Sequence, residues 1–186
     1  MGRLVATTFM SLDGVIKNPE EWQGPFFGED AGRFAEERLF ASDALLLGRG
    51  IYEVYAATWP TMDDDGGFVE KINKMPKYVV STTLDKAEWE NTTIIRGDVA
   101  DQVAKLKQEF EQDILVYGVG QLAHELLAHG LVDELEVWVH PILVGRTGGE
   151  ALIGREGSRH EFELVGTETT ELGVIICRYR PAVGKD

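Results

Sequence analysis

One stretch near the middle of the chain limits the possible fold more than any other. A continuous apolar run at residues 114–117 is interrupted by Gly118 and Gly120, and helical spacing of leucines then begins at Leu122. An apolar run without polar alternation is typical of a strand covered on both faces, as in a parallel sheet with helices on either side. The stretch therefore predicts an α/β fold in which a buried strand turns sharply into a helix.

The glycines of this turn suit one kind of ligand, an anionic phosphate group. Gly118 and Gly120 have no Cβ atoms, so a phosphate could approach the backbone, and the free N–H groups at the helix start would attract its charge. A bound dinucleotide is one interpretation. The other is a tight turn that simply needs small residues, because the third glycine of the dinucleotide fingerprint is absent.

The same arrangement occurs earlier in the chain. An apolar strand at residues 44–47 leads into Gly48, Arg49 and Gly50, where a second helix begins. The planar guanidinium of Arg49 is suited to a phosphate. Alternatively, Arg49 pairs at the surface with Glu53 four residues later, a contact worth roughly 0.2–0.5 kcal/mol.

Strands and helices alternate through most of the chain, which predicts right-handed crossovers and a largely parallel sheet. The strand at residues 77–83 ends in hydroxyl groups, where parallel sheets present ligand-binding groups. After Gly130 the pattern changes. Residues 131–141 alternate like a half-buried strand, and residues 162–167 and 174–179 indicate a closing antiparallel pair, so we expect a meander there.

Length and charge narrow the class of protein. With 186 residues the chain suits one well-packed domain, so we expect a single domain over residues 1–186. The formal net charge of −14 argues against nucleic-acid binding.

We expect a cytoplasmic protein without membrane contact, because no signal peptide or membrane-spanning run is present. The histidines lack metal-ligand spacing, so we expect no metal site.

Two further side chains have both a functional and a structural interpretation. Trp22 lies in an irregular segment after the first strand, where it either forms part of a lid over a pocket or closes the edge of the core. Asp30 lies in the first turn of a helix, where an acid suits the helix dipole. A carboxylate at this position could also bind a heterocycle and guide a proton to it.

Four short motifs follow one another along the chain: Ser-Leu-Asp-Gly at 11–14, Leu-Gly-Arg-Gly-Ile-Tyr-Glu at 47–53, Lys-Tyr-Val-Val-Ser-Thr at 77–82 and Tyr-Gly-Val-Gly-Gln-Leu at 117–122. Together these motifs resemble the dihydrofolate reductase superfamily. They are closest to the C-terminal reductase domain of the bacterial bifunctional riboflavin-biosynthesis deaminase/reductase. This resemblance implies a three-layer αβα fold with a mixed sheet, NADPH bound across the carboxyl ends of the strands, and commonly a homodimer.

The resemblance also implies roles for individual residues. Arg49 resembles the arginine that binds the 2′-phosphate of the cofactor, with Ser81 and Thr82 beside it. Asp30 resembles the carboxylate that orients the substrate and relays a proton. The implied pyrophosphate-binding residues are Gly48, Gly50, Gly118, Val119, Gly120 and Gln121, and the implied substrate-binding residues are Asp13, Trp22 and Phe34.

The function implied by this resemblance is an NADPH-dependent oxidoreductase that transfers hydride to a small heterocyclic or aminosugar substrate. The resemblance is to 5-amino-6-(5-phosphoribosylamino)uracil reductase of riboflavin biosynthesis. Two alternatives remain open, a dihydrofolate reductase proper and a non-catalytic NADP-binding module that has kept a reductase-like fold.

Overall fold

The structure is a computed structural model that describes residues 1–63, 67–145, 152–154 and 156–182. Its strands are β1 (Leu4–Ser11), β2 (Ser42–Gly48), β3 (Lys77–Val80), β4 (Thr92–Ile95), β5 (Asp113–Tyr117), β6 (Glu134–His140), β7 (Phe162–Thr169) and β8 (Ile175–Pro181). Its α-helices are α1 (Glu29–Phe40), α2 (Arg49–Thr58), α3 (Phe68–Lys74), α4 (Val99–Glu109) and α5 (Gln121–Ala128). Short 3-10 helices are η1 (Pro19–Glu21), η2 (Gly24–Phe26) and η3 (Trp59–Thr61).

These strands form one mixed sheet of eight strands in the order β4-β3-β2-β5-β1-β6-β8-β7. Neighbouring strands from β4 to β6 run parallel, whereas β8 is antiparallel to both β6 and β7. The structure confirms the predicted fold class. This is a three-layer αβα arrangement around a mostly parallel sheet with a C-terminal antiparallel pair. The predicted meander is wrong in one respect, because β6 pairs in parallel with β1, and β8 rather than β7 lies beside β6.

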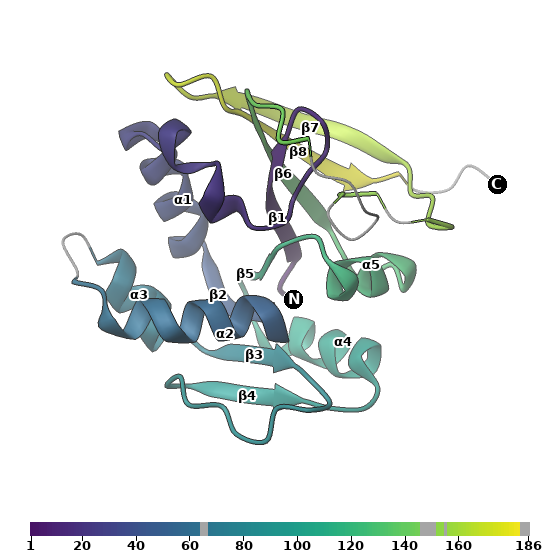
Figure 1. The fold of residues 1–186 in the computed structure, drawn as a ribbon. Helices are drawn as coiled ribbons and strands as arrows, with labels where there is room; N and C mark the ends of the chain where they lie inside the picture. The colour runs from purple at the N-terminus through teal and green to yellow at the C-terminus, as the bar shows by residue number, and fades with distance from the viewer. Residues whose placement is uncertain (64–66, 146–151, 155, 183–186) are drawn as a thin grey trace.

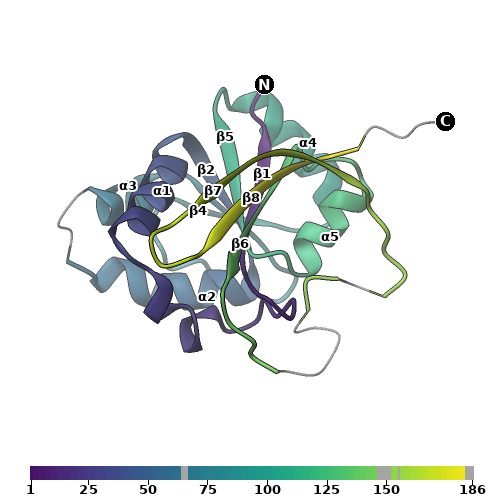
Figure 2. The same ribbon diagram turned by 90° about the horizontal axis from the view of Figure 1, so that it is seen from above.

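Helices cover the two faces of the sheet as separate layers, as the view from above in Figure 2 shows. One face carries α1, α2 and α3, whose buried residues Leu39, Tyr52 and Ile72 pack on β2 and β3. The other face carries α4 and α5, which pack on β1, β5 and β6. Asp98 caps the start of α4, since its carboxylate accepts from the Asp101 amide at 3.0 Å. No helix in the described ranges is both long enough and apolar enough to span a membrane.

The parallel pairing of β2 with β5 decides where the two glycine turns emerge. Leu46 of β2 lies opposite Val116 of β5, so both strands end at the same edge of the sheet and next to each other. Helices α2 and α5 start at this edge on opposite faces of the sheet (Figures 1 and 2). The carboxyl edge is therefore the region in which segments distant in the sequence meet.

A cluster of ionised side chains lies on the sheet face beneath α1. Arg38 Nη2 donates to Glu134 Oε1 at 2.9 Å and to Glu136 Oε2 at 2.7 Å. Its Nη1 donates to Asp113 Oδ2 at 3.3 Å. Arg3 pairs with Asp113 at 2.8 Å, and Arg178 pairs with Glu136 at 3.1 Å. We call this group the charged cluster: Arg3, Arg38, Asp113, Glu134, Glu136 and Arg178.

Glu136 is the most deeply buried carboxylate of the charged cluster, with 2% of its side chain exposed. Burial alone would raise the pKa of Glu136, but the charge of Arg38 and hydrogen bonds from Trp138, Arg38 and Arg178 outweigh it, and the pKa is lowered. The carboxylate also accepts from Thr7 Oγ1 at 3.2 Å. An ionised Glu136 therefore joins β1, β6 and β8 to α1.

Candidate functional site

Helices α2 and α5 both begin without a side-chain cap. Gly48 and Gly120 are their N-cap residues, both in extended conformation, and as glycines they provide no capping side chain. Neither first turn contains an acidic residue, whereas the first turns of α1, α3 and α4 each contain one or more. The first N–H groups of α2 and α5, together with the helix dipoles, thus suit an anionic ligand.

The two helix starts also pack against each other. A Cβ atom placed on Gly48 would lie 4.0 Å from Leu122 Cβ in α5, and one placed on Gly118 would lie 3.6 Å from Ile51 Cδ1 in α2. Gly118 has a φ of +83°, a left-handed conformation that glycine adopts readily. Its amide donates to the Thr7 carbonyl at 2.8 Å, which ties the turn to β1. The structure thus brings both predicted glycine turns to one place.

Arg49 lies at the start of α2 and is half-exposed. Its Nε donates to Glu53 Oε1 at 2.7 Å, the surface pairing that the sequence left as an alternative. Its Nη1 donates to Thr83 Oγ1, in the turn after β3. This contact places the guanidinium on the β3 side of the glycine turns. A phosphate at Arg49 would compete with the Glu53 carboxylate for the same donor groups.

Two of the predicted cofactor residues direct their side chains away from solvent. Val119 is 2% exposed and packs in the core beneath α5, so only its backbone could face a ligand. Ser81 is 7% exposed, and its hydroxyl accepts from the amides of Thr83 and Leu84 at 3.3 and 3.0 Å. Ser81 therefore shapes the turn after β3, and the exposed Thr82 and Thr83 form the surface of that turn.

Sequence reasoning missed two polar residues at this edge. Thr83, rather than Thr82, contacts Arg49. Arg96 directly follows β4, and its guanidinium donates to the Ser81 carbonyl at 3.5 Å and to the Leu84 carbonyl. The sequence did offer a signal for Arg96, because a cationic residue directly follows a predicted strand. It gives the β3 side of the edge a second positive charge.

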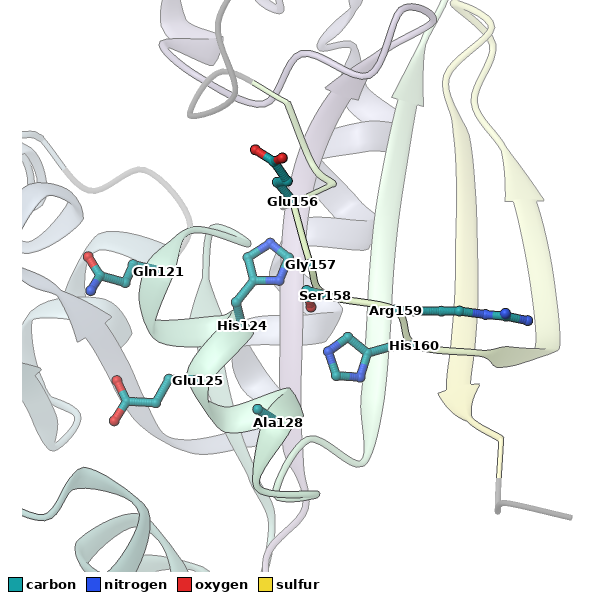
Figure 3. Close-up of a pocket in the computed structure, with 9 residues that line it drawn as sticks. All are labelled: Gln121, His124, Glu125, Ala128, Glu156, Gly157, Ser158, Arg159 and His160. Carbon is teal, nitrogen blue, oxygen red and sulfur yellow. The ribbon is translucent and has the colours of Figure 1, made fainter. Parts of the chain in front are cut away.

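A pocket of about 580 Å³ lies beside α5, lined by this helix and by residues 156–160 (Figure 3). Gln121 and His124 line it from α5, and Arg159 points away from the helix. The Nε2 atom of His124 lies 3.0 Å from the Ile153 carbonyl oxygen. Among the described residues that line this pocket, Gln121 is the only one predicted to bind the cofactor. The pocket therefore adjoins the glycine turns without coinciding with them.

The predicted substrate residues Trp22 and Phe34 belong to one aromatic group at the carboxyl ends of β1 and β6. Trp22 meets the His140 ring at 5.3 Å, and Phe9 meets it at 5.1 Å, in each case edge to face. Phe34 packs against the small core group that contains Trp138, and Trp138 lies 5.4 Å from Phe9 between ring centroids. We call this group the aromatic cluster: Phe9, Trp22, Phe26, Phe34, Trp138 and His140.

The carboxylates of Asp13 and Asp30 are both engaged by backbone amides. Asp13 accepts from Ser11 Oγ at 2.6 Å and from the Val144 and Gly145 amides at 3.1 and 2.7 Å. These hydrogen bonds, that of Ser11 first, lower the pKa of Asp13 to about 2, so it is ionised at neutral pH. Asp13 therefore joins the end of β1 to the segment after β6.

Asp30 is held in a similar way at the start of α1. Its Oδ1 accepts from the Ala31 amide at 2.9 Å, and its Oδ2 accepts from the Glu171 amide, in the turn between β7 and β8, at 2.6 Å. These contacts agree with the helix-dipole interpretation of Asp30. A proton-relay role would require the Glu171 contact to open or to coexist with the substrate contact.

The sequence matches a family profile described as RibD C-terminal domain over residues 3–176. A curated relative, the uncharacterized protein YyaP of Bacillus subtilis (strain 168), is 29% identical over 184 residues, which cover 95% of this chain and 94% of the relative.

Solved structures with low sequence identity share the fold. One is a diaminohydroxyphosphoribosylaminopyrimidine deaminase/5-amino-6-(5-phosphoribosylamino)uracil reductase from Thermotoga maritima, with a TM-score of 0.65 and 15% identity over 97% of this chain and 57% of that chain. Another is dihydrofolate reductase from Enterococcus faecalis complexed with NADP(H) and RAB-propyl, with a TM-score of 0.64 and 17% identity over 96% of each chain.

Proposed function

Because the chain belongs to the RibD C-terminal domain family, we propose that it is an NADPH-dependent reductase. The bound cofactor supplies the hydride, and the protein positions the cofactor and the acceptor. The proposed acceptor is a small heterocycle or aminosugar of the 5-amino-6-(5-phosphoribosylamino)uracil type. The Thermotoga maritima protein of similar fold is named as a reductase of this compound.

The observation that supports this proposal most strongly is the pairing of two uncapped helix starts beside one arginine. The first turns of α2 and α5 carry free N–H groups and no acidic residue, and Gly48 and Gly118 bring these turns into contact. A diphosphate between them would be bound by both helices. Arg49, turned toward β3, would then bind the 2′-phosphate, with Thr82, Thr83 and Arg96 around it.

The position of Arg49 also gives the cofactor a direction. With the 2′-phosphate on the β3 side, the nicotinamide would extend the opposite way from the glycine turns, toward β1 and β6. The aromatic cluster lies there, so hydride transfer would occur next to Trp22 and Phe34.

We include a homodimer in the proposal, since edge strand β7 exposes Leu164 and Val165, an apolar surface that a second copy could cover.

A second candidate function is a non-catalytic NADPH-binding protein, and the contacts of Asp30 favour it. The two backbone amides at its carboxylate leave Asp30 less able to act as a proton relay. The two candidates differ in turnover. A reductase oxidises NADPH when 5-amino-6-(5-phosphoribosylamino)uracil or dihydrofolate is added, whereas a binding module does not oxidise it with either compound.

Adding NADPH to the purified protein is expected to raise its melting temperature by several degrees, and NADH is expected to raise it less. A ligand at 100 times its Kd stabilises the folded state by about 2.7 kcal/mol. Each kcal/mol shifts the melting temperature of a domain of this size by about 2–4 °C. Differential scanning calorimetry with each cofactor at several concentrations measures the effect. The absence of a shift with either cofactor would contradict the proposed function.

A further inference from the structure

His140 is a buried imidazole at the substrate end of the proposed site. It is the last residue of β6, lies opposite Ser11 at the end of β1, and is 1% exposed. In the sheet, β6 is separated from β5 and its glycine turn only by β1, a distance of about 10 Å across the strands. A ligand beside the nicotinamide of the proposed cofactor would therefore lie within reach of His140.

The hydrogen bonds of His140 assign its two nitrogens different roles. Nδ1 lies 2.8 Å from the Trp138 carbonyl oxygen, which can only accept, so Nδ1 carries the hydrogen. Nε2 is then an acceptor, and this buried atom has no hydrogen-bond partner among the described residues. A buried acceptor without a donor is costly, so this arrangement calls for an explanation.

Burial keeps the ring in this acceptor form. Loss of solvation lowers the pKa of His140, although the carbonyls of Trp138 and Met10 act in the opposite direction. The neighbouring groups are aromatic, with Phe9, Trp22 and Phe26 meeting the imidazole at 5.1, 5.3 and 6.1 Å between ring centroids. A neutral imidazole among these rings can accept a hydrogen bond but offers no second N–H group.

The rings around His140 come from two kinds of segment. Phe9 and Trp138 project from strands β1 and β6, whereas Trp22 and Phe26 belong to the connection between β1 and α1. Within that connection the structure shows the short 3-10 helices η1 and η2 and an isolated β-bridge from Val15 to Leu152. A long irregular connection of this kind is typical of a segment that moves over a binding site. Displacement of Trp22 and Phe26 would uncover His140 without disturbing the sheet.

We propose that Nε2 of His140 accepts a hydrogen bond from the substrate and selects a flat heterocycle that carries an N–H group. This inference rests on the proposed function, because the proposed orientation of the cofactor puts the substrate where β1 and β6 end at the carboxyl edge of the sheet. The ligand replaces Trp22 and Phe26 against the His140 ring and supplies the donor that Nε2 lacks. An analogue of the same shape without an N–H group would leave the buried acceptor unpaired and is rejected.

The test uses 5,6-diaminouracil as the probe, a flat pyrimidine with several N–H donors, added to protein saturated with NADPH. In His140→Phe, which keeps a flat ring but removes the acceptor, we expect the probe to bind about 10-fold more weakly or worse. NADPH affinity should stay within about twofold, because the phosphate contacts are distant. The same substitution at exposed His129, at the C-terminus of α5, is the control and should leave probe binding unchanged.

Nitrogen-15 NMR of the histidine rings in the wild-type protein provides a second readout that does not depend on how the variant folds. Saturation with 5,6-diaminouracil should shift the His140 Nε2 resonance toward that of a hydrogen-bonded acceptor, with the tautomer unchanged. Equal probe binding by wild type and His140→Phe, an unshifted Nε2 resonance at saturation, or no binding by the wild type would each overturn the role of His140. The proposed function fails separately, through the absence of an NADPH response.

Discussion

Replacing Arg49 by alanine is expected to weaken NADPH binding by about 10- to 100-fold, the range for hydrogen bonds to a charged group. The guanidinium lies beside the start of α2 and reaches Thr83 on the β3 side, where the 2′-phosphate is proposed to bind. NADH has no 2′-phosphate, so its affinity should change little. Calorimetric titration of both cofactors into wild type and Arg49→Ala separates the two effects.

Two further variants make this test specific. Glu53→Gln removes a carboxylate that competes for Arg49, so it should strengthen NADPH binding. Arg180→Ala removes an exposed arginine of β8 paired with Glu163 and should not affect either cofactor. Equal weakening of NADPH and NADH by Arg49→Ala would show that the arginine does not bind the 2′-phosphate. Unchanged NADPH binding would remove Arg49 from the site.

Replacing Arg38 by alanine is expected to lower the free energy of unfolding by about 3–5 kcal/mol, the range for breaking a buried ion pair from one side. Arg38 is 14% exposed and contacts three carboxylates, of which Glu136 is 2% exposed. Without Arg38, the charged cluster keeps three carboxylates for only Arg3 and Arg178. Urea denaturation at neutral pH measures the loss.

Arg33→Ala is the matched control, because Arg33 lies on the same helix and pairs with Glu37 four residues later. Both partners are more than half exposed, at 58% and 62%. Such a pair contributes only about 0.3–0.5 kcal/mol. If Arg38→Ala and Arg33→Ala lowered the free energy of unfolding by similar amounts, the charged cluster would not be the stabilising centre described here.

The glycine turns were predictable from sequence because their chemistry is local. The apolar runs before Gly48 and Gly118 and the helical spacing after them lie within a few residues of each turn. The neighbouring positions of the turns followed from the parallel sheet that the strand–helix alternation predicts. Their direct contact, through Ile51 and Leu122, became visible only in the structure.

Residues whose environment is formed by distant segments could not be placed in this way. Alternation along residues 134–140 resembles a half-buried strand, yet Glu136 is buried because Arg38 and Arg178 neutralise it from α1 and β8. Similarly, Lys77 is fully buried, and its Nζ donates to the Asn73 and Met75 carbonyls at 2.6 and 2.8 Å. Neither residue carries a local signal of burial.

The assembly of the aromatic cluster could not be predicted for the same reason, although Trp22 and Phe34 had each been singled out. Trp138 and His140 lie two residues apart on one face of β6, which was a usable signal. Their partners Phe9 and Trp22, however, are more than 110 residues away along the chain, and only the pairing of β1 with β6 brings them together. The neighbouring positions of the glycine turns were therefore predictable from the sequence, whereas the grouping of Trp22 with Trp138 and His140 was not.

A crystal structure of the protein with NADPH tests the central claim most directly, because it shows where the diphosphate binds. The account predicts diphosphate oxygens within about 2.7–3.2 Å of backbone nitrogens in the first turns of both α2 and α5, with the 2′-phosphate at Arg49. A diphosphate that contacts only one of these helices, or that occupies the pocket between α5 and residues 156–160, would contradict it.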